Sequence, residues 1–299
     1  MAYLLQQVLN ALPLAALYGL LSFGYALSFG MTRRVDITFG ALFAFAGQIF
    51  VLFTDIGWNR YYLILPASLG LGAVAALAYA LGASAFIGRH VMRPLFRQSS
   101  NALLVASLAV LILLSETARL ASGSRDIWLS PFLNQPVVLM KNADGFTASL
   151  TVLQIVNTGM MVLLLATSAI VMRVSRLGRL WRAVADDPLA ARFCGVDADR
   201  VFVVGFLVAG ALATIAAILS TAYYGTMDFG AGLVFGVKVA LIAAAGGQSY
   251  PLYAALGAAA VALAETLWSG YGPIVWKDFV ITGSLVILLI ASRRERLIP

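Results

Sequence analysis

The fold of this chain is decided by its longest polar stretch, residues 179–200, which reads R-L-W-R-A-V-A-D-D-P-L-A-A-R-F-C-G-V-D-A-D-R. Apolar runs at 150–172 and 201–224 flank this stretch, and each is long enough to span a bilayer. Apolar side chains recur within it at helical spacings of three and four, at Trp181, Val184, Ala185 and Leu189. The pattern predicts an amphipathic helix bracketed by two membrane spans.

A second short helix follows in the same stretch. Asp187 followed by Pro188 is typical of a helix N-cap and a first-turn proline, and Gly195 is a suitable C-cap after Cys194. Two short helices across the membrane face predict a docking element, in a coupling loop at about 173–200. The alternative is a plain cytoplasmic loop whose arginines only fix the topology.

The composition places the whole chain in lipid as one domain, 1–299. Of 299 residues, 62% are hydrophobic and 11% are charged, whereas about 25% are charged in an average soluble protein. The mean hydropathy is +0.93. This length holds roughly nine or ten spans of about 20 residues, so we expect an all-α polytopic bundle with no soluble domain and no nucleic-acid partner.

One cysteine, Cys194, and one histidine, His90, exclude an intramolecular disulfide and a cysteine or histidine metal cluster. We therefore expect no catalytic residue, cofactor or metal on this chain. The N-terminus lacks the basic region of a cleavable signal peptide, so the first span is expected to remain.

Nine apolar segments are the expected spans, and two of them, 37–54 and 232–245, are short enough to be half-helices. The nine segments are 8–30, 37–54, 61–87, 101–120, 150–172, 201–222, 232–245, 252–268 and 274–290. A polar turn is expected at 55–60, another turn at 246–249, and a long extracytoplasmic loop at 121–149 with a hairpin turning at 142–145.

The arginines predict the orientation. They gather at 33–34, 89–97, 173–200 and the C-terminal tail, and nine crossings put all four places on one side. That side is the cytoplasm by the positive-inside rule, so the N-terminus is expected outside the inner membrane and the C-terminus inside.

An internal repeat is also expected. Residues 36–43 and 228–235 share the pattern D-x-x-x-G-x-x-F, each after a long span, and the two preceding spans run in opposite directions. An inverted repeat with paired broken helices places a substrate site near the bilayer midplane.

The coupling stretch resembles the R-A-x-x-x-D-x-x-x-A-x-x-x-G-[IV] loop of ABC-importer permeases, and within them most closely the branched-chain amino-acid permease family. The matching positions, together with the neighbouring proline and arginine, are Arg182, Ala183, Asp187, Pro188, Ala191, Gly195 and Arg200. The C-terminal third is similar to the same family at Lys238, Gly246-Gly247, Pro251, Glu265 and Trp276-Lys277-Asp278.

The resemblance implies a bacterial inner-membrane permease subunit whose coupling helix sits in a cleft of an ATP-hydrolysing subunit. It also implies a second permease subunit, identical or different, and a periplasmic substrate-binding protein. The chain itself contains no G-x-x-x-x-G-K-[ST], so ATP and Mg²⁺ are expected on the partner ATPase. We therefore expect a transport subunit that is not itself an enzyme.

The predicted substrate path consists of polar, aromatic and glycine residues at the two breaks, together with one lysine. Its members are Asp36, Thr38, Phe39, Gly40, Asp228 and Lys238. Asp36 is either a helix N-cap or a polar break facing the path, and Lys238 either snorkels to an interface or faces the bundle interior.

This chain departs from the pattern of the branched-chain family at the start of the second apolar segment. Where the branched-chain family has Asn and His, this chain has Asp36 and Phe39; Asp36 and Thr38 are closer to the related sugar permeases. Branched-chain or other hydrophobic amino acids lead as substrate, and urea, amides, organic acids or sugars stay open. An ion-coupled secondary transporter is the alternative of a different class.

Overall fold

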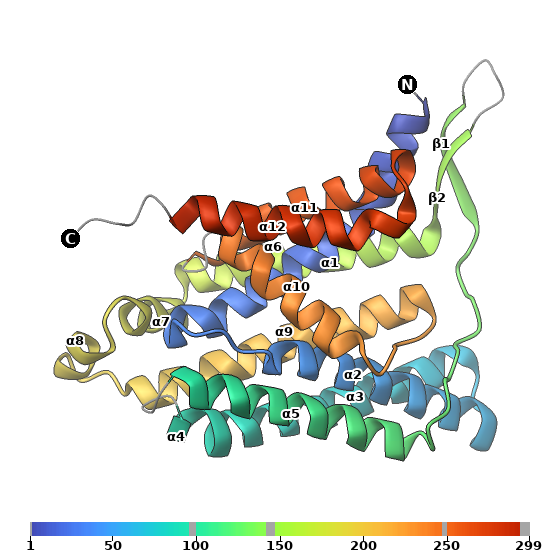
Figure 1. Ribbon diagram of the computed structural model, residues 1–299. Helices are drawn as coiled ribbons and strands as arrows, with labels where there is room; N and C mark the ends of the chain where they lie inside the picture. Colours follow the sequence, from blue (N-terminus) through green and yellow to red (C-terminus); the bar gives the residue numbers. More distant parts are fainter. Residues whose placement is uncertain (1, 96–99, 142–146, 247–249, 294–299) are drawn as a thin grey trace.

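The structure is a computed structural model that describes residues 2–95, 100–141, 147–246 and 250–293. Arg97, the turn predicted at 142–145, most of the turn at 246–249 and the tail beyond Arg293 lie outside the described residues. The described part is a helical bundle with one β-hairpin at one end (Figure 1). The all-α polytopic fold is therefore confirmed.

Each of the nine predicted spans contains a helix. These helices are α1 (Ala2–Thr32), α2 (Thr38–Asp55), α3 (Leu65–Ile87), α5 (Ser100–Ala121), α6 (Val152–Val174), α9 (Ala198–Tyr224), α10 (Ala231–Gly246), α11 (Pro251–Tyr271) and α12 (Lys277–Arg293). Among the described residues, 7 helices are long and apolar enough to cross a membrane, whereas α10 and α12 have 16 and 17 residues.

The shorter elements lie between them. They are the π-helical turns η1 (Ile56–Arg60) and η2 (Gly88–Met92), α4 (Arg93–Leu95), the strands β1 (Pro136–Lys141) and β2 (Thr147–Thr151), α7 (Arg176–Asp186), α8 (Pro188–Phe193) and the 3-10 turn η3 (Ile274–Trp276). The expectation of a turn at 55–60 and of a half-helix before it was wrong. Helix α2 runs directly into η1, giving a span of 23 residues from Thr38 to Arg60.

The hairpin and the α7–α8 segment lie at opposite ends of the bundle (Figure 1). Strands β1 and β2 pair antiparallel, as predicted, and the side chain of Gln6 near the start of α1 bonds both backbone groups of Ser149. At the other end, α7 packs on the last turns of α1. Helix α1 therefore runs from the hairpin end to the α7 end, and α9 runs the opposite way.

Helices α1, α2 and α9 form the centre, because they are apolar around their whole circumference and bury most of their residues. Small side chains allow close packing here. Ala254, Ala258 and Ala262 repeat every four residues along the face of α11 and are fully buried, and α11 packs along α1. In lipid this close packing replaces hydrophobic burial as the main attraction between helices.

The helix contacts agree with the predicted inverted repeat. Helix α2 packs on α3 and α5, and α10 packs in the same way on α11 and α12. Helix α1 packs on α11 while its counterpart α9 packs on α3. After both α1 and α9 the chain turns back into the bundle before the next helix begins (Figure 1).

Candidate functional site

The α7–α8 segment forms as its sequence predicts. The Ser175 side chain caps α7 by accepting from the Gly178 N–H, and the Asp187 carboxylate caps α8 by accepting from the N–H groups of Leu189 and Ala190 at 2.8 and 3.1 Å. Gly195 follows α8 with φ of 80°, a left-handed conformation that favours glycine. The two short helices and their caps are thus confirmed.

Helix α7 is fixed to the end of α1. The buried Trp181 indole donates from Nε1 to the carbonyl oxygen of Leu27 at 3.0 Å. Its ring fills the space that a side chain at Gly30 would need. From the other direction, the Arg33 guanidinium donates to the carbonyl oxygen of Ala185 at 2.8 Å. A displacement of α7 must therefore act on the last turns of α1.

Arg182 and Asp187 both have roles inside the chain. Arg182 donates to the carbonyl oxygens of Met172 and Arg173 at 2.7 and 3.3 Å, which satisfies the C-terminal end of α6. Asp187 is occupied as the cap of α8. The motif residues Arg182 and Asp187 thus set the shape of the segment, and Ala191 is buried against Val184 and Ala198.

The exposed face of α8 carries two large apolar side chains. Leu189 is 64% exposed and Phe193 is 86% exposed, and they lie one helical turn apart. Charged pairs surround them: Arg192 contacts Asp199 at 3.0 Å, and Arg200 contacts Asp197 at 2.9 Å. Sequence reasoning missed Leu189 and Phe193 as a pair, although their spacing on the face opposite Ala191 was the signal for it.

The second part of the site is the crossing of α2 and α10. A methyl group added at Gly40 would overlap the carbonyl oxygen of Gly232 and the Cα of Gly236, so the two backbones touch. The rings of Phe43 and Phe235 lie 5.1 Å apart between centroids. Equivalent positions of the D-x-x-x-G-x-x-F pattern thus contact each other, and the first turns of the two helices lie side by side.

The two aspartates of that pattern make the same local bond. Asp36 accepts from the N–H of Thr38, and Asp228 accepts from the N–H of Gly230, each two residues on. Asp36 is buried, whereas Asp228 is exposed. Each aspartate thus closes a turn of the chain just before its helix begins, which explains the pattern locally.

Thr38 and Phe39 are buried beside α1. The ring of Tyr25 lies edge-on to that of Phe39, at 6.3 Å between centroids. Within the described part of the chain, the hydroxyls of Thr38 and Tyr25 are buried without a hydrogen-bond partner. Buried hydroxyls are normally bonded, so the start of α2 is a place where a polar group can bind.

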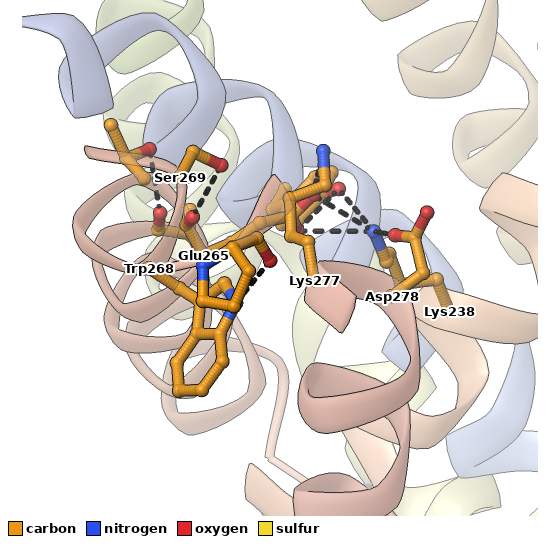
Figure 2. A network of polar contacts seen from close by, with 10 residues as sticks. Lys238, Glu265, Trp268, Ser269, Lys277 and Asp278 are labelled. Carbon is orange, nitrogen blue, oxygen red and sulfur yellow. Dashed lines mark hydrogen bonds and ion pairs between the residues drawn. The ribbon is translucent and has the colours of Figure 1, made fainter. Parts of the chain in front are cut away.

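The third part is a charged network at Lys238, which the structure places in the bundle interior (Figure 2). Lys238 Nζ lies 3.0 and 3.1 Å from the two carboxylate oxygens of Glu265, and the Tyr18 hydroxyl donates to the same carboxylate at 3.0 Å. Glu265 is only 4% exposed. The network joins α10, α11 and α1.

Two charged residues at the start of α12 complete the network on the side that faces the surface. Lys277 Nζ is 3.5 Å from Glu265, and Asp278 is 3.4 Å from Lys238. The Asp278 side chain is largely exposed, so the network extends from the interior to the surface. It offers both positive and negative partners to a solute at membrane depth, where ionisable groups are costly and usually functional.

Comparisons with known proteins identify relatives over nearly the whole chain. A family model described as "Branched-chain amino acid transport system / permease component" matches residues 7–289. The high-affinity branched-chain amino acid transport system permease protein LivH of Escherichia coli (strain K12) is 29% identical, over 96% of this chain and 93% of LivH. LivH of Salmonella typhimurium is 28% identical and BraD of Pseudomonas aeruginosa is 25% identical, with the same coverage. No solved structure matches.

Proposed function

This chain belongs to the family of permease components of branched-chain amino acid transport systems. From that family membership we propose how the parts of the site act in transport. It is a multi-pass permease subunit of an ABC transporter in the bacterial inner membrane. We assign the α7–α8 segment, helix α1 and the charged network at Lys238 each to one step of transport.

The exposed face of α8 is the docking surface for the ATP-binding subunit. Leu189 and Phe193 supply an apolar anchor within a charged rim, which is the usual composition of a compact protein interface. ATP and Mg²⁺ act on that partner. This assignment puts α7–α8 and the C-terminus in the cytoplasm, and the hairpin and the N-terminus outside.

Helix α1 carries the motion inward. Its last turns accept the bond of Trp181, and Arg33, directly after α1, donates to Ala185 of α7. Tyr18 lies nine residues before Leu27, about 14 Å along the helix. Tyr18 is bonded to Glu265, so one rigid helix connects the α7–α8 segment with the charged network. This connection is the observation that carries the proposal.

The substrate is a branched-chain amino acid, delivered by a periplasmic binding protein to a path formed with a second permease subunit. Its ammonium and carboxylate groups require partners of both signs. Lys238 and Glu265 supply such partners, and the hydroxyls of Thr38 and Tyr25 add polar contacts near the α2–α10 crossing.

The decisive experiment replaces the anchor on α8. Phe193→Asp removes an exposed ring from a docking face and should lower co-purification of the ATPase subunit by about tenfold or more, with loss of leucine uptake. Val138→Asp on the hairpin, an apolar and exposed position at the other end of the bundle, is the control and should leave both unchanged.

Normal recovery of the ATPase with Phe193→Asp would refute this docking surface. Leucine uptake that persists in cells lacking the ATPase subunit would instead favour an ion-coupled secondary transporter.

A further inference from the structure

A cavity of about 580 Å³ lies between α6 and α11, with α1 as its floor and α7 across its end. This volume is within the usual range for a ligand site. Helices α6 and α11 are among the least buried spans, and Leu252 and Tyr253 at the rim are largely exposed. The cavity therefore faces the outside of the subunit.

Its lining changes character along the membrane normal. Arg33, Arg173 and Arg182 line the end next to α7, with Asp186 as the one acidic residue, so the lining carries a net charge of +2 from three arginines and one aspartate. Phe23, ten residues before Arg33, lines the opposite end. At 1.5 Å per residue the cavity reaches roughly 15 Å into the bundle, about one leaflet of a 30 Å hydrocarbon core.

The aromatic side chains mark the same boundary. Tyr250 and Tyr253 line the cavity where α11 begins, with ring centroids 5.7 Å apart, and aromatic residues prefer the headgroup level of a bilayer. Guanidinium groups at that level bind phosphate through paired hydrogen bonds. From the α7 end inward, the cavity wall is first basic, then aromatic and then apolar. A phospholipid presents its phosphate, its interfacial region and its acyl chains in the same order.

We propose that this cavity binds one anionic phospholipid of the cytoplasmic leaflet, with its phosphate at the arginines and an acyl chain along Phe23 and Ala169. The inference rests on the proposed function only for the cytoplasmic placement of α7. Since α7 forms one wall, a bound lipid contacts the coupling helix directly.

Arg173 is the side chain to change. Arg33 and Arg182 hold backbone carbonyls, whereas among the described residues the Arg173 side chain has no hydrogen bond or ion pair within the chain. Arg176, also exposed but outside the cavity, is the matched control for the loss of one charge.

Trp181 lines the cavity and reports on its contents. In the assembled transporter, with Trp58, Trp128, Trp268 and Trp276 replaced by Phe, fluorescence quenching by brominated phosphatidylglycerol and brominated phosphatidylcholine gives the relative binding of the two lipids. We expect phosphatidylglycerol to be preferred at least about fivefold, because one basic group near an anionic surface contributes about that factor.

The arginine variants then distinguish specific lipid binding in the cavity from a general attraction of anionic lipid to the positive surface. Arg173→Gln should lower the preference about fivefold, Arg173→Lys should keep most of it, and Arg176→Gln should leave it unchanged. Equal quenching by both lipids, or an equal loss with Arg176→Gln, would overturn the proposal.

Two further outcomes would also overturn it. Inorganic phosphate that abolishes the preference, where sodium chloride of equal ionic strength does not, would indicate a free-anion site. Quenching in the isolated chain but not in the assembled transporter would mean that another subunit covers the cavity. The readout is lipid preference, so its failure leaves the docking test at Phe193 unaffected.

Discussion

Helices α2 and α10 begin with the same eight-residue pattern and cross at its glycines, yet their surroundings differ. Helix α2 is buried along most of its length between α3, α5 and α9. Helix α10 has exposed residues on one side and carries Lys238, whose equivalent position in α2 is the fully buried Ala46. The repeat therefore preserves the geometry of the break but not its chemistry.

The difference between α2 and α10 distinguishes the part of the bundle that is structural from the part that lines the substrate path. The turn bond of Asp36 or Asp228 to the N–H two residues on needs only the local sequence, so it is present in both halves. A charge at membrane depth needs a partner, and the second half provides one for Lys238, at Glu265. We infer that the first half mainly holds the bundle together and that the charged partners of the solute lie on α10 and α11, with Thr38 and Tyr25 adding polar contacts.

The largest expected effect is at Lys238. Lys238→Met leaves the Glu265 carboxylate buried with a weaker set of partners, which should destabilise the protein by about 3–5 kcal/mol. The double variant Lys238→Met/Glu265→Gln removes both charges and should recover most of this stability while leucine uptake stays lost. Thermal unfolding of the purified chain and uptake in cells measure the two properties.

Lys277→Gln is the control for that pair, because Lys277 is more exposed and lies farther from Glu265, so its loss should change little. Wild-type uptake by the double variant would mean that the network only ties helices together, and the contrast between the two halves would lose its functional meaning.

The next effect concerns the glycines at the crossing. Gly40→Ala places a methyl group on the backbone of α10 and should cost about 1–3 kcal/mol. The equivalent change, Gly232→Ala, meets its nearest atoms at 3.2 Å and should cost less. Gly70→Ala in α3 has open space around it and should be neutral or stabilising. Equal thermal stability of the Gly40→Ala and Gly70→Ala variants would disprove the backbone contact.

The smallest effect is at the two turn aspartates. Asp36→Ala leaves the buried N–H of Thr38 without its acceptor and should cost about 1 kcal/mol, whereas Asp36→Asn keeps the acceptor oxygen. Asp228→Ala should cost only a few tenths of a kcal/mol, since water can replace an exposed acceptor. If Asp228→Ala lowers the free energy of unfolding more than Asp36→Ala in the same assay, the assignment of Asp36 to the buried scaffold and of Asp228 to the open path is contradicted.

Much of this fold depends on local sequence. The nine helices, the hairpin and the capped α7–α8 pair arise from periodicity, turn residues and caps within a few positions of each other. The continuation of α2 into η1 was not predicted, because polar residues at 55–60 indicate a turn unless packing extends the helix.

The site was predicted in part. Lys238 was listed among the path residues with an interfacial position as the alternative, and its partner Glu265 was noted only through the family resemblance. Tyr18 was missed because nothing local distinguishes it from other aromatic residues of α1; its role depends on α11 packing beside it. The inward contacts of Arg182 were missed for the same reason, since a long side chain can reach in several directions.

Sidedness tests the central claim, that α8 faces the cytoplasm and the hairpin faces outside. Cys194 is exposed at the end of α8 and serves as the first reporter. A Cys194→Ser/Val138→Cys variant moves the thiol to an exposed position on β1 and serves as the second.

A membrane-impermeant maleimide is added to intact cells and to cells permeabilised with detergent. We expect Cys194 to be labelled only after permeabilisation, and the thiol introduced by Val138→Cys to be labelled in intact cells. Labelling of Cys194 in intact cells would contradict the cytoplasmic placement, because α8 could then not dock a cytoplasmic ATPase.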